Sequence, residues 1–376
     1  MRTFIVILAV VIAAGLVAAP ASLQEAAESP YDVVNGWLKP FATSGYAWGS
    51  HTAVFAESPD RIFVTQRGEI RLPDPVPPGF AGFVSSIGLN PLQPGDARVW
   101  RNCIFVVDGD GNMIEAWTQW DQLYEGSNGP HRIRIDPNDP ERRVWVVHET
   151  GHVIHVFSND GSELLMTLGE MGVSGNDETH FGRPQDVAFL PDGSVFVADG
   201  LDNSRVVKFD AGGNYVTEWP PDGERSSDRG HFDGVHALAT DARGNIYVAD
   251  RGNRRVQVFN QTTRNTWYHP NISPIGTWPD FDSPFDIMAT GYDIWVADGN
   301  PAKLIKLDVN GNRLDTWSMD GDGPGQFSQL HQFSVDQEGA LYASDPALGR
   351  TQKFVARDGA DPGRLIGTPD PPVTAP

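Results

Sequence analysis

The feature that most constrains the fold is an internal repeat of about 50 residues. Five copies of one pattern begin at positions 131, 185, 236, 285 and 331, so successive starts lie 46–54 residues apart. A more divergent copy runs from His51 to Gln66. Each copy holds two short apolar stretches joined by a polar turn, as in Gln185–Phe189, the turn at 191–193, and Val195–Asp199. Repeats of this length are typical of propellers and solenoids.

The rest of each copy supplies two further strands. A third apolar stretch follows at 205–209, 255–259 and 352–355, and a tryptophan marks a closing strand at Trp117, Trp219, Trp278 and Trp317. Short strands of alternating pattern joined by Gly, Asp and Asn turns form antiparallel sheets. One such sheet cannot bury its apolar faces alone, so the sheets must stack in a ring. The sequence therefore predicts an all-β, six-bladed β-propeller over residues 51–357, with four antiparallel strands per blade.

The two ends of the chain are expected to lie outside this ring. Arg2, the apolar run from Phe4 to Ala19 and the small residues at 19–21 are typical of an export signal, and the run is short for a membrane span. We expect residues 1–21 to be a cleaved signal peptide and the protein to be secreted or periplasmic. Residues 22–50 form an N-terminal segment in which Tyr31 to Leu38 could supply a closing strand. Residues 358–376 are expected to be a Pro-rich disordered tail.

Charge and cysteine content exclude some partners and chemistries. The formal net charge is −21, which argues against nucleic acid or an anionic membrane surface as partner, because phosphate contacts need clustered Lys and Arg. We expect no membrane contact after signal cleavage, and the sequence gives no oligomeric state. The single cysteine, Cys103, cannot form an internal disulfide and opens the apolar strand 103–107. A buried structural thiol is predicted there.

Three histidines occupy one position of the repeat in alternate copies. The first residues of the five clear copies are His131, Gln185, His236, Phe285 and His331. In a six-fold ring, alternate positions lie about 120° apart, and the start of each inner strand borders the central channel. Three imidazoles meeting there leave a fourth position open, as in catalytic zinc sites. The sequence therefore predicts a zinc site, although copper, iron and nickel also accept imidazole. The alternative is that each histidine only hydrogen-bonds nearby backbone, and the role of His51 stays open.

Two motifs that resemble metal sites are predicted to be turns. Residues 148–152 match the H-E-x-x-H pattern of metalloproteases, which requires a helix to bring both histidines to one face. Here the motif lies between two apolar stretches, 144–147 and 153–157, so a strand-to-strand turn is predicted. Residues 108–112 resemble the opening of a calcium loop, but Met113 stands where the obligatory Gly should be. A hairpin turn is predicted there as well.

The repeats resemble a known signature. The stretch Val248–Phe259, Val-Ala-Asp-x-Gly-Asn-x-Arg-Val-x-x-Phe, resembles the NHL repeat, and Val197–Phe209 is nearly parallel to it. Roughly residues 50–357 are similar to the peptidyl-α-hydroxyglycine α-amidating lyases. That resemblance implies an axial zinc held by three histidines, which match His131, His236 and His331.

The same resemblance implies two active-site arginines. They match Arg67, in the segment 66–68, and Arg251, directly after Asp250. An arginine at either position could hold a substrate carboxylate bidentately, so we expect a small-molecule or peptide substrate with an anionic group. A surface or inter-blade salt bridge is the alternative for each.

The chain departs from the family pattern in several places. Leu201 stands where the family has a catalytic Tyr, which removes the expected general base. Gln332 replaces a calcium-ligating Asp, which puts a calcium site in doubt, and Gln329 replaces a Met. The family's structural disulfides are absent, since the chain has one cysteine.

These observations leave three functional hypotheses. The first is an enzyme: a secreted, zinc-dependent lyase or hydrolase in which Arg67 and Arg251 orient an anionic group. The resemblance implies cleavage of an α-hydroxyglycine-type substrate into an amide and glyoxylate. The second is a non-catalytic propeller that binds a peptide, protein or glycan, and Leu201 favours it. The third is a purely structural ion on the axis.

Overall fold

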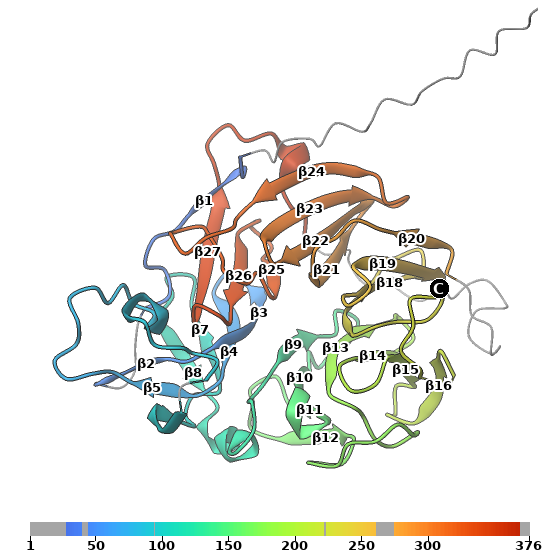
Figure 1. Cartoon of the computed structure of the whole chain (residues 1–376), viewed down its shortest axis with the longest axis horizontal. Helices are drawn as coiled ribbons and strands as arrows, with labels where there is room; N and C mark the ends of the chain where they lie inside the picture. The colour runs from blue at the N-terminus through green and yellow to red at the C-terminus, as the bar shows by residue number, and fades with distance from the viewer. Residues whose placement is uncertain (1–27, 40–43, 94, 222, 261–273, 369–376) are drawn as a thin grey trace, which may run out of the picture.

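The computed structural model describes residues 28–39, 44–93, 95–221, 223–260 and 274–368. Six four-stranded antiparallel sheets stand around a central axis (Figure 1). Each sheet contains one copy of the sequence repeat, which confirms the six-bladed β-propeller. The expected signal peptide, residues 1–21, lies outside the described residues.

The strands of each blade are ordered from the axis outward. The first blade has β3 (His51–Ser58), β4 (Arg61–Gln66), β7 (Ile104–Val107) and β8 (Met113–Ala116), and the second has β9 (Arg132–Ile135), β10 (Val144–His148), β11 (Val153–Phe157) and β12 (Leu164–Leu168). The third has β13 (Pro184–Phe189), β14 (Val195–Asp199), β15 (Arg205–Phe209) and β16 (Tyr215–Trp219), and the fourth has β17 (Val235–Thr240), β18 (Asn245–Asp250), β19 (Arg255–Asn260) and β20 (Gly276–Trp278). The fifth has β21 (Pro284–Thr290), β22 (Asp293–Gly299), β23 (Ala302–Asp308) and β24 (Arg313–Ser318).

The sixth blade joins the two ends of the chain. It has β25 (Phe333–Val335), β26 (Leu341–Asp345) and β27 (Arg350–Ala356), and its outer strand is β1 (Tyr31–Val33) from the N-terminal segment. Tyr31 pairs with Ala356 in antiparallel register and packs 5.7 Å from the ring of Trp317. The N-terminal segment therefore closes the ring.

The core lies between neighbouring blades. Six of the apolar clusters combine residues from two adjacent blades, so every blade-to-blade interface has its own cluster. The predicted closing-strand tryptophans are all buried in these clusters: Trp117, Trp219, Trp278 and Trp317. Burial between sheets explains why a single repeat could not fold alone.

Two regions add to the repeat pattern. The long connection between β4 and β7 contains β5 (Glu69–Arg71), β6 (Arg98–Val99) and the 3₁₀ turns η1 (Val84–Ile87) and η2 (Gly95–Ala97). Its two strands form a small sheet with β2 (Tyr46–Trp48) of the N-terminal segment. The structure also differs from the expected tail, because residues 358–368 include the 3₁₀ turn η5 (Pro362–Arg364). Ile366 there is buried, and its N–H donates to Tyr31 Oη at 2.9 Å. Residues 369–376 lie outside the described part.

Cys103 and Asp108 have the surroundings predicted for them. Cys103 is fully buried, and burial raises the pKa of its thiol. The Asp108 carboxylate accepts hydrogen bonds from the N–H groups of Asp110 and Asn112, which closes a hairpin turn between β7 and β8.

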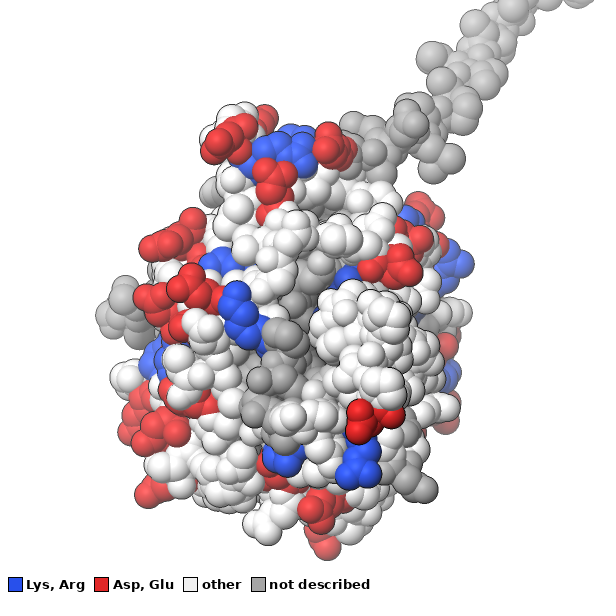
Figure 2. Space-filling model, turned by 90° about the vertical axis from the view of Figure 1, so that its left-hand side faces the viewer, with Lys and Arg blue, Asp and Glu red and all other residues white. Residues whose placement is uncertain are grey.

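Within the described ranges, no helix has the length and apolarity that crossing a membrane requires. Acidic and basic side chains are interspersed on the face in Figure 2, which shows no broad basic patch.

Candidate metal centre

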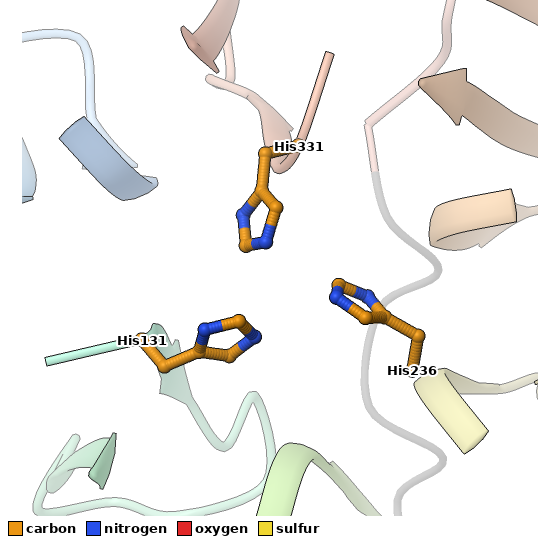
Figure 3. Close-up of side chains that lie close together, drawn as sticks. All are labelled: His131, His236 and His331. Atoms are coloured by element: carbon orange, nitrogen blue, oxygen red, sulfur yellow. The ribbon is translucent and has the colours of Figure 1, made fainter. Parts of the chain in front are cut away.

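The three alternate-blade histidines meet on the propeller axis. His131, His236 and His331 point toward one another from three different blades (Figure 3). One ring nitrogen from each lies within 4.8 Å of the others, and the ring centroids are 4.8–5.4 Å apart. That spacing lets small imidazole rotations bring all three nitrogens to one metal ion.

The local backbone explains why this repeat position faces the axis. In four blades the pairing register of the inner strand shifts here, leaving Thr52, Gln185, His236 and Phe285 outside the regular ladder. A β-bulge of this kind re-aims a side chain. In the other two blades, His131 lies directly before β9 and His331 lies two residues before β25.

This register also settles the position of His51. Thr52, and not His51, takes the bulge position of the first blade. The His51 side chain lies between the first and sixth blades. Its Nδ1 is 2.9 Å from Thr351 Oγ1, and its ring packs near Trp48 and Phe105. Burial lowers the pKa of His51 to about 3. His51 is therefore a neutral core residue away from the three axial imidazoles.

Backbone carbonyls fix two of the three imidazoles. His236 Nδ1–H donates to the Phe285 carbonyl at 2.7 Å, and His331 Nδ1–H donates to the Thr52 carbonyl at 2.6 Å. Each bond places the proton on Nδ1 and leaves the Nε2 lone pair free, as is usual for metal-ligating histidines. Neither nitrogen of His131 has a regular hydrogen bond among the described residues, although its Nδ1 lies 3.3 Å from Glu149 Oε2.

Burial also sets the protonation of this group. The three histidine residues are 1–4% exposed. Burial lowers the pKa of each imidazole below its usual value, and the pKa of His131 falls despite the nearby Glu149 carboxylate. All three rings are therefore neutral at pH 7, which is the form that binds metal.

Glu149 connects His131 to two arginines. Its Oε2 lies 3.5 Å from Arg67 Nη2, and its Oε1 accepts a hydrogen bond from Arg183 Nη2. Burial disfavours the carboxylate charge, but His131, Arg67 and Arg183 together hold the pKa of Glu149 well below its usual range. Sequence reasoning did not identify Arg183 or this role of Glu149.

Arg251, the second predicted arginine, is the cation near the histidines whose guanidinium makes the fewest polar contacts with described residues. Its guanidinium carbon lies 5.0 Å from the centroid of the Phe285 ring, which in turn lies 4.7 Å from the His236 ring. Within the described residues, its guanidinium makes no hydrogen bond or ion pair. An arginine with unused donors beside a polar centre can hold a carboxylate.

The H-E-x-x-H segment does not form a helix. His148 ends β10, and the 3₁₀ turn η4 (Glu149–Gly151) leads to His152 in a left-handed conformation with φ 59°. His148 Nε2 lies 2.8 Å from Ser127 Oγ, whereas His152 Nδ1 accepts the Arg183 N–H at 3.2 Å. The two imidazoles therefore make different contacts, as expected if this segment is a turn and not a helix.

Leu201 lies close to the start of the His236 strand. Its Cδ2 is 3.9 Å from the position that a Cβ on Gly234 would take, and its carbonyl accepts a hydrogen bond from Arg225 Nη2 at 2.6 Å. An alkyl side chain here provides no proton acceptor.

Comparisons with known proteins agree with the repeat and the fold. The NHL repeat family model matches residues 181–209 and 232–259. A probable peptidyl-α-hydroxyglycine α-amidating lyase of Caenorhabditis elegans is 30% identical over 221 residues, covering 57% of this chain and 60% of that protein. Peptidylglycine α-amidating monooxygenase of Rattus norvegicus is 29% identical over 275 residues, covering 70% and 26%. A solved Bacteroides thetaiotaomicron protein of unknown function superposes with a TM-score of 0.52 at 12% identity, covering 87% and 73%.

These matches confirm the resemblance drawn from the sequence. The chain carries NHL repeats and is homologous to amidating lyases. It spans 60% of the length of the worm protein and about a quarter of the rat protein, and the solved structure supports the fold alone.

Proposed function

We propose that this protein is an exported, metal-dependent carbon–nitrogen lyase that cleaves an α-hydroxyglycine-type substrate into an amide and glyoxylate. The observation that carries the proposal is the meeting of three buried, neutral imidazoles on the axis, with arginines beside them. Homology to amidating lyases supplies the class of reaction.

The residues present fit a zinc ion. Two of the three imidazoles have Nδ1 hydrogen-bonded to a carbonyl. Among the described residues, nothing bonds their Nε2 atoms, and the third imidazole has two buried nitrogens without a regular hydrogen bond. Unpartnered buried nitrogens are costly unless something binds them. Zinc prefers nitrogen ligands of this kind, and when bound by three histidines it supplies Lewis acidity at an open fourth position.

Glu149 is proposed to position His131 and to hold Arg67. Replacing it with glutamine removes the charge that faces His131 Nδ1 and both arginines while keeping the side-chain shape. We expect the dissociation constant for zinc to rise by about 10- to 100-fold. Competition with a chromophoric chelator measures this, and Glu163→Gln, at an exposed glutamate, is the matched control. An unchanged zinc affinity in Glu149→Gln would remove the positioning role.

His148 is expected to be dispensable for metal. His148→Ala removes the contact with Ser127 and the packing 4.9 Å from the Tyr124 ring, so it should cost roughly 2 kcal/mol of stability. Metal content should stay at the parent value, because this imidazole does not face the axis. Elemental analysis of the variant checks this expectation, and loss of the metal would place His148 among the ligands.

Arg251 is proposed to bind the substrate carboxylate. Its guanidinium donors have no acceptor among the described residues, and Phe285 holds it beside the His236 imidazole. A carboxylate paired with Arg251 would therefore place the neighbouring α-carbon near the axis. Arg67 adds a positive charge next to Glu149, but its contact with that carboxylate makes it the less available partner.

The proposed reaction needs one proton transfer in each direction. The substrate hydroxyl loses its proton, the bond from the α-carbon to nitrogen breaks as the carbonyl of glyoxylate forms, and the departing amide nitrogen gains a proton. Leu201 cannot accept the hydroxyl proton, so another group must act as the base. We assign Glu149 to positioning because two arginines already share its carboxylate.

Incubation with α-hydroxyhippurate tests the proposal. We expect zinc-loaded protein to release benzamide and glyoxylate in equal amounts, and chelator-treated protein to release neither. Absence of glyoxylate above the buffer background with zinc-loaded protein would contradict this substrate class.

Leu201 favours a second candidate, a propeller that binds a peptide, protein or glycan without chemistry. Such a binding surface does not require a stoichiometric metal. Purified protein without metal, together with no glyoxylate release, would select this alternative.

A further inference from the structure

The channel beneath the histidines is filled by four charged side chains. Arg132 and Arg134 come from β9 of the second blade, Asp186 comes from β13 and Asp286 from β21. Arg132 and both aspartates have fully buried side chains, and the Arg134 side chain is 12% exposed. We call these four residues the axial quartet.

The axial quartet is held by direct contacts across the ring. Arg134 Nε donates to Asp186 Oδ1 at 3.1 Å, and its Nη2 donates to Asp186 Oδ2 at 2.9 Å and to Asp286 Oδ1 at 2.6 Å. Arg132 Nη1 lies 3.2 Å from Asp286 Oδ1, and its Nε lies 3.6 Å from Asp186 Oδ1. Two positive and two negative charges balance at the centre of the fold.

Backbone groups occupy further acceptor positions of both carboxylates. Leu238 N–H donates to Asp186 Oδ2 at 3.1 Å, and Phe333 N–H donates to Asp286 Oδ2 at 3.0 Å. The carboxylates therefore bridge the inner strands of the third to sixth blades. All their oxygens are engaged by the protein itself.

Gln332 contacts the backbone between Arg132 and Arg134, and its side chain does not provide a calcium site. Its Nε2 donates to the Ile133 carbonyl at 2.9 Å, and its Oε1 has no hydrogen bond among the described residues. Calcium takes six to eight oxygen ligands, several of them carboxylates. One neutral amide oxygen cannot replace that set, and the Asp186 and Asp286 carboxylates are already engaged by guanidinium groups. The calcium site implied by the family resemblance therefore does not fit this chain.

We propose that the Arg132 and Arg134 guanidinium groups take the place of a divalent cation on the propeller axis. The chain then holds a single metal ion, at the three histidines, and needs none in the layer below. Arg132 also donates to the Phe285 carbonyl at 2.9 Å, the same carbonyl that accepts the His236 Nδ1–H. The axial quartet thus supports one histidine without a second ion.

Arg134→Met tests this inference without touching the His236 contacts. The parent protein should melt at the same temperature with millimolar calcium or with EGTA. Removing the Arg134 charge leaves two buried carboxylates against one guanidinium, so the variant should melt roughly 10 °C lower. Millimolar calcium should recover part of that loss, because a cavity of about 460 Å³ at the channel mouth includes Arg134 in its lining and gives an ion access.

Two variants provide the controls. Arg134→Lys keeps the positive charge and should show no calcium response, and neither should Arg134→Met combined with Asp286→Asn. A calcium-dependent rise in the melting temperature of the parent, or a second tightly held ion in its elemental analysis, would overturn the inference, as would equal calcium responses in Arg134→Met and its controls. The measurements on the parent protein test the inference even if a variant fails to fold. They are also independent of the lyase proposal, since none of them measures glyoxylate.

Discussion

Replacing His236 with alanine is expected to remove the bound metal and to lower kcat/KM for glyoxylate release by about 1,000-fold or more. Two imidazoles cannot provide the three protein ligands of a catalytic zinc site. The Lewis acidity that the ion contributes is worth several kcal/mol of transition-state stabilisation, and each 1.36 kcal/mol corresponds to tenfold in rate. Elemental analysis and the glyoxylate assay on the same preparation measure both losses.

The matched control for His236→Ala is His148→Ala, which removes another buried imidazole. Circular dichroism should show that both variants keep the β-propeller. Full activity in folded His236→Ala would remove the axial ion from the mechanism, and equal losses in both variants would point to destabilisation instead.

Replacing Arg251 with alanine is expected to lower kcat/KM by about 10- to 100-fold, mainly through a higher KM. A hydrogen bond to a charged group contributes roughly 1.5–3 kcal/mol, and no acceptor in the described part of the chain takes the Arg251 guanidinium donors. Arg251→Lys should recover only part of the loss, because an ammonium group cannot pair bidentately with a carboxylate. Steady-state kinetics with α-hydroxyhippurate measure the effect.

Arg313→Ala is the control for that experiment. Arg313 also stacks over a phenylalanine, with its guanidinium carbon 5.2 Å from the Phe281 ring, but it is exposed and does not lie near the histidines. Its loss should leave kcat/KM unchanged. A substrate without the carboxylate should be insensitive to Arg251→Ala, and equal losses with and without the carboxylate would exclude the proposed contact.

The repeat made most of the fold predictable. Each copy carries its own turn residues and strand pattern, so local signals place strands such as Val195–Asp199 and Asn245–Asp250 without knowledge of distant contacts. Ring closure then follows from the number of copies. The alternation of histidines among the copies brought His131, His236 and His331 together for the same reason, because equivalent positions must be related by the symmetry of the ring.

Contacts between blades could not be predicted in this way. Glu149 corresponds to Asp250 in the overlay of copies, yet Asp250 pairs with Arg255 of its own blade at 2.7 Å, whereas Glu149 contacts Arg67 of the first blade and Arg183 at the start of the third. The residue at one repeat position thus contacts different partners in different blades. The H-E-x-x-H interpretation was correct in rejecting a helix, but nothing in the segment revealed the role of its glutamate.

The axial quartet could not be predicted from the sequence for a related reason. Arg132, Asp186 and Asp286 occupy the repeat position that holds Ala237 in the fourth blade, and Arg134 lies two residues further along the strand. No single copy contains both an acid and a base at these positions. Their pairing depends on the width of the channel, which only the assembled ring defines. The ordered residues 358–368 likewise depend on Tyr31, more than 300 positions away in the chain.

The most direct test of the account is an anomalous-scattering experiment at the zinc edge on crystals of the parent protein. The account predicts a single strong peak on the axis, about 2.0–2.1 Å from one nitrogen of each of His131, His236 and His331. A zinc-loaded crystal without a peak among these imidazoles, or with its peak bound elsewhere, would contradict it.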